Sequence, residues 1–234
     1  MADGVRIRLL GGFYVTVGDR PVAAGAWRLR KARSLVKVLC LSPGHRMHRE
    51  KIYDLLWPDL DRGAASNNLH QVLHAVRRAL ASAGTPDDIV VLRDDMVLLG
   101  LGGGVRIDVD ELDAAIRQAM SSGTEADCRA ALALAEGELL PEDRYEAWVT
   151  EAAEALRRRR TVLDLELAET LERDHRRAEA LDVLRSLAAR EPLDEPGHRA
   201  LMRTLADAGR RREALAAYER LRDALQREAG ADRS

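Results

Sequence analysis

The chain has 234 residues, 46% of them hydrophobic and 32% charged, so it can form one large or two small folded domains and its composition excludes disorder. No apolar run reaches the roughly 18 residues that span a bilayer, and the N-terminus lacks the apolar core of a signal peptide, so we expect a cytoplasmic protein. The net charge of −2 conceals an asymmetry: residues 1–104 hold 15 Lys/Arg against 10 Asp/Glu (+5) and residues 105–234 hold 22 against 29 (−7), so only the first segment suits a polyanion.

The first half of the chain begins with strands and continues with helices. Apolar residues alternate with polar ones in residues 5–9 and 13–17, with glycines between the two runs, which predicts two short antiparallel strands. After Trp27 the apolar period changes to 3.6, which predicts a helix over about 29–39 that "SPG" stops. A shorter helix follows, with its apolar face at residues 52–56.

A third helix, a hairpin and a glycine-rich stretch complete this half. The sequence "AASNNLHQVLHAVRRAL" predicts a helix that starts after "DRG" and ends near Ser82. The apolar runs "IVVL" and "MVLL" flank residues 93–95 and predict a hairpin. The stretch Gly100–Gly104 is the most flexible composition in the chain, so we predict a domain boundary there.

The second half is predicted to be entirely helical. Asp110 and Asp113 have the spacing of a helix cap ahead of an apolar stripe at Leu112, Ile116 and Met120. The apolar periodicity then predicts further helices at about 125–136, 144–173, 176–190, 195–208 and 211–228.

An internal repeat lies within these helices. The stretch 177–187 aligns with 212–221 at an offset of 34, which matches Ala180 with Ala214 and Leu187 with Leu221. A period of 34 residues is that of tetratricopeptide repeats, in which helix pairs bury their apolar faces against each other. An earlier, looser copy is predicted at "CRAALALAEGELLPED".

The third predicted helix has an unusual polar face. With Leu69 as the origin and 100° per residue, the apolar residues Val72, Leu73, Val76 and Leu80 fall within about 60° of Leu69. Asn67, Gln71, His74 and Arg78 fall on the opposite side, between about 140° and 200°.

No carboxylate interrupts this face between Ala64 and Ser82, whereas an ordinary solvated helix mixes acidic and basic residues. Asn and Gln side chains can bond adenine bidentately, and Arg can do the same to guanine. A merely solvated helix is therefore the weaker explanation. The sequence predicts that these four residues read bases: Asn67, Gln71, His74 and Arg78.

The order of two strands, three helices and a hairpin is that of a winged helix, in which the third helix enters the major groove of DNA. Basic and polar residues around that helix, at the start of the first helix and at the hairpin tip, suit contacts to the phosphate backbone. The predicted phosphate contacts are Arg28, Arg30, Lys31, Arg33, Arg49, Ser66, His70, Arg77 and Arg93.

The stretches "LRKARSLVKVLCLSPGHRMHREKIYDLLWPD" and "ASNNLHQVLHAVRRAL" resemble the winged helix of the SARP family, the actinobacterial activators of antibiotic biosynthesis. The helical part from "VDVDELDAAI" to "LRDALQRE" resembles the bacterial transcriptional activator domain of that family. The resemblance implies an OmpR-like winged helix over residues 1–104 and a tetratricopeptide-like activator domain over 105–234. It also implies binding to direct repeats in promoters, as a homodimer on DNA, and contact with RNA polymerase holoenzyme.

Other chemistry is less well supported. His70 and His74 have the spacing of a metal pair, but the Glu of H-E-x-x-H and a third ligand are missing. No phosphate-binding loop or nucleophile motif occurs, so we expect no enzyme activity, no cofactor and no metal. The run "RRRR" at 157–160 favours an ion-paired solvated face over a second nucleic-acid patch, and Cys40 and Cys128 are expected to be buried free thiols.

The sequence thus predicts a mixed fold, with an α+β winged helix-turn-helix followed by an all-α repeat domain. Its predicted function is sequence-specific, DNA-binding transcriptional activation, without membrane contact and near the nucleoid. The alternative is a helical-repeat scaffold or a regulatory module of a larger signalling ATPase, with a winged helix that binds protein.

Overall fold

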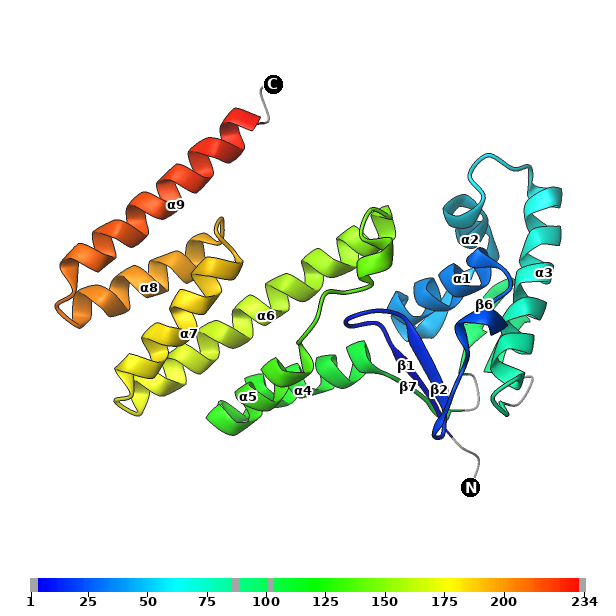
Figure 1. Cartoon of the computed structure of the whole chain (residues 1–234), viewed down its shortest axis with the longest axis horizontal. Helices are drawn as coiled ribbons and strands as arrows, with labels where there is room; N and C mark the ends of the chain where they lie inside the picture. The colour runs from blue at the N-terminus through cyan, green and yellow to red at the C-terminus, as the bar shows by residue number, and fades with distance from the viewer. Residues whose placement is uncertain (1–3, 86–88, 101–102, 232–234) are drawn as a thin grey trace. The chain divides into compact units, whose positions relative to one another are not determined.

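The structure is a computed structural model that describes residues 4–85, 89–100 and 103–231 (Figure 1). The chain forms two compact units. The first comprises Met1–Glu111 and Glu136–Ala153, and the second comprises Leu112–Ala135 and Glu154–Ser234. The domain boundary predicted at Gly100–Gly104 is a statement about which parts of the chain fold independently, and it stays a prediction. Residues 101–102 of that glycine-rich stretch lie outside the described residues.

A small sheet opens the first unit. β1 (Val5–Arg8) pairs antiparallel with β2 (Tyr14–Val17), which confirms the two predicted strands, and β2 pairs with β3 (Arg20–Pro21). The alternating pattern buries every second side chain of β1 and exposes the arginines between them. β7 (Val105–Ile107), which was not predicted, pairs parallel with β1 and completes the order β3-β2-β1-β7.

Three helices and a hairpin follow. The helices are α1 (Arg30–Leu41), α2 (Arg49–Leu56) and α3 (Arg62–Ala81). β5 (Val90–Arg93) and β6 (Met96–Leu99) form the predicted hairpin, and β4 (Arg46–His48) joins it in the order β4-β6-β5. Asp94 and Asp95 both have positive φ, at 48° and 65°, as a type I′ turn requires. The result is the predicted winged helix.

The core of this unit lies where α1 packs against α2, α3 and β6, and where α3 packs against α2 and β5. The apolar stripes predicted from the periodicity supply it: Leu35, Leu39, Ile52, Leu69 and Leu80 are fully buried. Each such side chain contributes roughly 1.5–3 kcal/mol of transfer free energy to folding. The packing therefore fixes the rotation of α3, and with it the face that α3 turns to solvent.

Six helices build the second unit or run into it: α4 (Asp108–Ser122), α5 (Glu125–Leu134), α6 (Ala147–Arg173), α7 (Arg177–Arg190), α8 (Glu195–Asp207) and α9 (Arg211–Ala231). The five helices predicted after residue 124 are confirmed to within three residues at each bound. α7, α8 and α9 follow one another in antiparallel order, with α8 packed on both neighbours (Figure 1).

The predicted 34-residue spacing of the repeat is confirmed, but the equivalent side chains of its two copies are not equally buried. α7 and α9 start 34 residues apart, at Arg177 and Arg211. Leu181 and Leu184 of α7 are buried, whereas their predicted equivalents are exposed, Leu215 at 64% and Tyr218 at 52%. The two helices differ because, among the described residues, no further helix covers that side of α9.

Three predictions about residues 108–143 are wrong. β7 runs directly into α4, so the helix begins at Asp108 and not after a cap at Asp110. Met120 is 41% exposed and Ala119 takes the buried position one residue earlier. The looser third copy of the repeat is also wrong, because α5 ends at Leu134 and Glu136–Ala153 belongs to the first unit.

No helix among the described residues has both the length and the apolar character needed to cross a membrane.

Candidate nucleic-acid interface

α3 is held rigidly at its N-terminus. The carboxylate of Asp61 caps the helix by accepting hydrogen bonds from the backbone N–H groups of Gly63 and Ala64, at 2.9 and 3.0 Å. Arg62, the first helical residue, pairs with Glu50 and Asp54 of α2, at 2.7 and 3.2 Å. The helix therefore starts two residues earlier than the sequence predicted and is tied to α2.

The four predicted base-reading residues share one exposed face of α3. Asn67, Gln71, His74 and Arg78 are all exposed, while the apolar residues on the opposite side are buried. None of the four side chains makes a hydrogen bond or an ion pair within the described part of the chain. A row of unengaged donors and acceptors on a rigid helix is what base recognition in a groove needs. The base-reading role itself stays a prediction.

The predicted phosphate contacts on α3 differ in exposure and in whether their side chains already form hydrogen bonds. His70 is exposed and Ser66 is half-buried. Arg77 donates a hydrogen bond from Nε to the carbonyl oxygen of Val90 at 2.9 Å, so it links α3 to β5. This link positions the wing relative to α3.

Two further predicted phosphate contacts lie at the wing. Arg93 is exposed and directly precedes the turn. Arg49, the first residue of α2, donates its backbone N–H to the carbonyl oxygen of Asp95 at 2.8 Å and pairs with the Asp95 carboxylate at 3.2 Å. Arg49 therefore fixes the turn of the wing relative to α2. Its side chain is also half-buried, so it is less available to a phosphate than Arg93.

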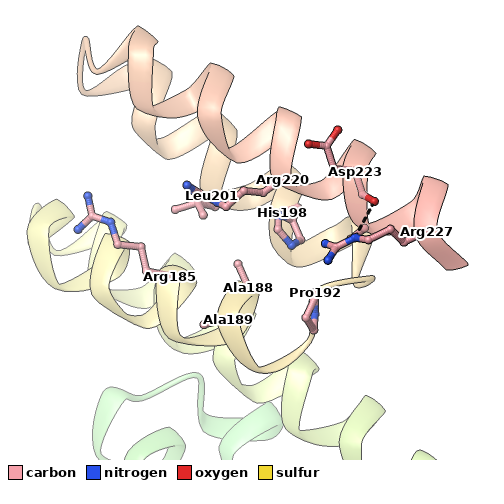
Figure 2. A pocket seen from close by; sticks show the side chains of 10 residues that line it. Arg185, Ala188, Ala189, Pro192, His198, Leu201, Arg220, Asp223 and Arg227 are labelled. Carbon is pink, nitrogen blue, oxygen red and sulfur yellow. Dashed lines mark hydrogen bonds between the residues drawn. The ribbon is translucent and has the colours of Figure 1, made fainter.

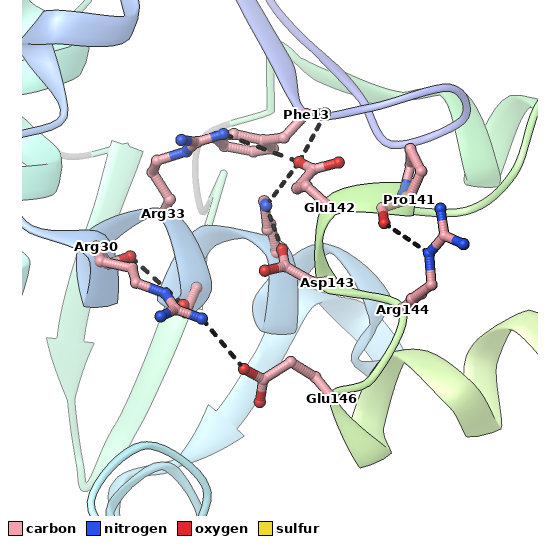
Figure 3. A network of polar contacts seen from close by, with 10 residues as sticks. Phe13, Arg30, Arg33, Pro141, Glu142, Asp143, Arg144 and Glu146 are labelled. Atoms are coloured by element: carbon pink, nitrogen blue, oxygen red, sulfur yellow. Dashed lines mark hydrogen bonds and ion pairs between the residues drawn. The ribbon is translucent and has the colours of Figure 1, made fainter.

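The predicted phosphate contacts at the start of α1 fall into two pairs. Arg28 and Lys31 are exposed and form no ion pair among the described residues. Arg30 instead faces Glu146 at 3.6 Å, and Arg33 faces Glu142 at 3.8 Å (Figure 3). Both carboxylates come from the segment Glu136–Ala153, more than a hundred residues along the chain.

A buried ion-pair cluster anchors this acidic segment to α1. Lys37 is 2% exposed, and its Nζ pairs with Glu142 at 2.8 Å and with Asp143. The same ammonium group lies 5.0 Å from the centre of the Phe13 ring, in cation–π contact. The backbone N–H of Phe13 donates to Glu142 at 3.1 Å (Figure 3). The cluster therefore joins α1, the strand region and the acidic segment.

The surroundings of Glu142 favour the ionised form of its carboxyl. Burial, the largest single influence, raises the pKa of its carboxyl, but the hydrogen bond and charge of Lys37 and the backbone hydrogen bonds of Glu142 and Phe13 together outweigh burial and leave the pKa below its ordinary value. The carboxylate is consequently ionised at neutral pH, as an ion pair with buried Lys37 requires.

Backbone hydrogen bonds also join the acidic segment to the strand region. The N–H of Gly11 donates to the carbonyl oxygen of Glu138 at 2.8 Å, and the N–H of Leu140 donates to that of Leu9 at 2.9 Å. Gly137 allows this approach, since a Cβ there would lie 2.9 Å from the Gly11 nitrogen and its φ is +95°. The acidic segment is thus paired with the chain that links β1 to β2.

Three aspartates in the first two turns of α4 form contacts other than helix caps. The Asp108 carboxylate accepts hydrogen bonds from the backbone N–H groups of Leu9 and Leu10, at 2.8–3.0 Å, and so holds the end of β1. Asp110 pairs with His45 at 2.9 Å, and Asp113 pairs with Arg159. The capping prediction for Asp110 and Asp113 is wrong, because both lie inside the helix.

The alternative sites are not supported in the described ranges. These residues contain no group of three or more His, Cys, Asp or Glu side chains arranged to hold a metal ion. Within "RRRR", Arg158 pairs with Glu154 at 3.8 Å and Arg160 donates to the carbonyl oxygen of Ala135 at 2.7 Å, in line with a paired surface. Cys40 and Cys128 are free and buried, as predicted.

Comparisons with known proteins place the chain in a family. The family model of the bacterial transcriptional activator domain matches residues 107–234, which is over half of the chain. A search of curated proteins finds no match. Among solved structures, Mycobacterium tuberculosis EmbR in complex with a low-affinity phosphopeptide is similar, with a TM-score of 0.75 and 22% identity. That match covers 94% of this chain and 59% of EmbR, so this chain spans less than two thirds of EmbR.

Two structures of MamA point mutants are also similar, but weakly. The first matches with a TM-score of 0.31 and 17% identity over 68% of this chain and 86% of its own. The second matches with a TM-score of 0.31 and 16% identity over 88% of this chain and 91% of its own. These scores are too low to support an argument about fold.

The EmbR likeness establishes the fold, a winged helix followed by a helical domain. The family model independently identifies the helical part. The chain therefore belongs to the bacterial transcriptional activator domain family.

Proposed function

We propose that the chain binds promoter DNA at direct repeats through α3 and recruits RNA polymerase holoenzyme. The observation that carries this proposal is the exposed, carboxylate-free row of α3, Asn67, Gln71, His74 and Arg78, on a helix whose opposite face is locked into the core. A helix of this kind fits the major groove and presents donors and acceptors to base edges.

The roles divide by chemistry. Arg78 is suited to bidentate contact with guanine, and Asn67 and Gln71 are suited to adenine. Arg28, Lys31, His70 and Arg93 are exposed and serve as phosphate contacts. These groups supply salt-dependent affinity but no sequence information.

Fluorescence anisotropy with GC-rich direct-repeat DNA tests the DNA-binding half of the proposal. The chain is expected to prefer the repeat over a scrambled duplex and to lose affinity as salt is raised. Arg78→Ala should weaken binding to the repeat by roughly 1–3 kcal/mol, the cost of one bidentate guanine contact.

The matched control is Arg203→Ala, at an exposed arginine of α8 with no ion pair in the described part of the chain. Equal losses in both variants, or affinity that is indifferent to salt, would contradict the proposal. A winged helix that binds a protein partner instead would show no preference for the repeat.

Recruitment is tested separately with purified holoenzyme. On repeat-containing promoter DNA, the chain should raise polymerase occupancy in a mobility-shift assay, and Arg78→Ala should abolish the gain at protein concentrations where it no longer binds. Unchanged polymerase occupancy beside normal DNA binding would refute recruitment while leaving the DNA-binding proposal intact.

A further inference from the structure

A pocket lies within the second unit, between the two equivalent helices of the repeat. Its volume is about 430 Å³, in the range of roughly 300–1,000 Å³ typical of small-molecule sites. α7 and α9 form its walls, α8 contributes to its floor, and most of its exposed lining is apolar (Figure 2). The apolar part is formed by Ala188, Ala189, Pro192, Leu201 and Ala224.

A buried histidine forms part of the pocket wall. His198 of α8 is 3% exposed, and both of its ring nitrogens are covered by surrounding atoms. Neither nitrogen makes a well-formed hydrogen bond to the described residues, but the carbonyl groups of Pro192 and Ala217 lie close enough to act on the ring.

The imidazole is held in its neutral form. Burial lowers the pKa of His198, and the nearby positive charge of Arg220 lowers it further, while Asp194 and the carbonyls of Pro192 and Ala217 act in the opposite direction. A neutral ring adds no charge to the pocket, so the positive charge there comes from arginine side chains.

The polar rim of the pocket is mainly cationic. Arg220 makes no hydrogen bond or ion pair with the described residues, and Arg227 uses only its Nε, which donates to the carbonyl oxygen of Asp223 at 3.1 Å. Figure 2 shows the Arg220, His198 and Arg227 side chains between the ribbons of α7 and α9.

The remaining charges at the rim are already compensated. Arg185 is bound by Asp182 and Glu213, at 3.2 and 3.1 Å. The Asp223 carboxylate pairs with Arg222 at 2.9 Å, and Figure 2 shows it directed away from Arg227. The free positive charge at the pocket therefore comes from Arg220 and Arg227.

We propose that this pocket binds a small organic acid, with an anionic head held by Arg220 and Arg227 and an apolar body packed on the alanines and Leu201. Arginine forks match carboxylate and phosphate oxygens, so either head group satisfies the cationic rim. The apolar floor selects against a bare inorganic ion. The site is separate from α3, and its existence does not depend on DNA binding.

Isothermal titration calorimetry on the full chain at constant ionic strength tests the proposal with four probes. Phenyl phosphate and benzoate carry the two head groups on one apolar body, inorganic phosphate lacks the body, and benzyl alcohol lacks the charge. We expect saturable one-site binding of phenyl phosphate or benzoate, with the stronger of the two identifying the head group. Inorganic phosphate and benzyl alcohol should bind at least tenfold more weakly.

Variants then locate the site. Arg220→Gln and Arg227→Gln should each weaken binding about tenfold, the loss expected for one charge-assisted hydrogen bond. Ala189→Leu, at an exposed position of the pocket wall, should block binding by filling the space. The matched control is Arg212→Gln, at an exposed arginine of the same α9 that lies outside the pocket. It should leave the affinity unchanged.

His198→Phe keeps an aromatic ring in the pocket wall and changes no charge of the site, so it should lower the affinity by less than Arg220→Gln does. Three results would overturn the proposal: neither organic acid binds, inorganic phosphate binds as tightly as phenyl phosphate, or Arg212→Gln loses as much affinity as Arg220→Gln. None of these results bears on binding of promoter DNA, so failure here is distinguishable from failure of the proposed function.

Discussion

The polar face of α3 and the N-terminus of α1 were both predicted to contact DNA, yet their side chains have different electrostatic surroundings. The α3 residues Asn67, Gln71, His74 and Arg78 make no polar contact with the described chain. At α1, Arg30 and Arg33 already face Glu146 and Glu142, and buried Lys37 binds the same acidic segment. Basic composition therefore does not by itself show which residues are available to DNA.

The difference has an energetic consequence. A phosphate that binds Arg30 or Arg33 has to compete with a carboxylate, so the net gain in affinity is smaller than at an unpaired cation. Arg28 and Lys31 have no such competitor among the described residues. We therefore expect the phosphate contacts of α1 to be unequal, with Lys31 stronger than Arg30, although all four residues look alike in the sequence.

The largest expected effect comes from breaking the contact that holds the acidic segment on α1. Lys37→Met leaves Glu142 and Asp143 without their buried partner, with side chains that are 34% and 13% exposed. We expect the free energy of unfolding to fall by about 3 kcal/mol, measured by urea denaturation.

Arg144→Met serves as the control, because Arg144 is exposed and its ion pair with Glu138 is long, at 3.7 Å. Its effect should stay below about 1 kcal/mol. Adding Glu142→Gln and Asp143→Asn to Lys37→Met removes the stranded charges and should recover much of the loss. A single Lys37→Met variant as stable as the wild type would show that the cluster does not hold the segment.

The second-largest expected effect is on DNA affinity, and it distinguishes unpaired Lys31 from ion-paired Arg30. Lys31→Ala should lower affinity for repeat and scrambled DNA alike and reduce the salt slope by about 1, as expected when one phosphate contact is lost. Arg30→Ala should change the slope by less, because Arg30 is already paired with Glu146 at 3.6 Å. An equal reduction of the salt slope in the two variants would mean that DNA displaces Glu146 from Arg30 at little cost in free energy.

The smallest effect is a pH dependence. The folded-state pKa of Glu142 lies below its ordinary value of 4.5, so its charge stabilises the fold above that pH, and the contribution is lost as the pH falls through the lowered value. The stability difference between the wild type and Glu142→Gln should therefore be largest near neutral pH and narrow in acid. A difference that does not change with pH would show that the ionised carboxylate is not the stabilising group.

Local patterns predicted α3 and the wing well. The period of 3.6 around Leu69 fixed which residues of α3 are buried, and hence which are exposed, because core packing decides the rotation of a helix. The Asp94-Asp95 turn followed from two apolar runs at hairpin spacing. These features depend on residues close together in the sequence.

The missed features depend on residues far apart in the sequence. β7 pairs with β1 across about a hundred residues, and Lys37 meets Glu142 at a separation of 105. No periodicity reports such a pairing. The one signal for the cluster was a lysine inside the apolar run "LVKVL", since a lysine is almost never fully buried without a partner.

The central claim is that α3 reads sequence while α1 contributes only phosphate contacts. It is tested most directly by measuring the affinities of the wild type, Arg78→Ala and Lys31→Ala for a set of duplexes in which each base pair of the repeat is varied in turn. The account predicts that Arg78→Ala loses the preference at one base pair and that Lys31→Ala keeps the whole preference profile at lower affinity. An unchanged profile in Arg78→Ala, or an altered one in Lys31→Ala, would contradict it.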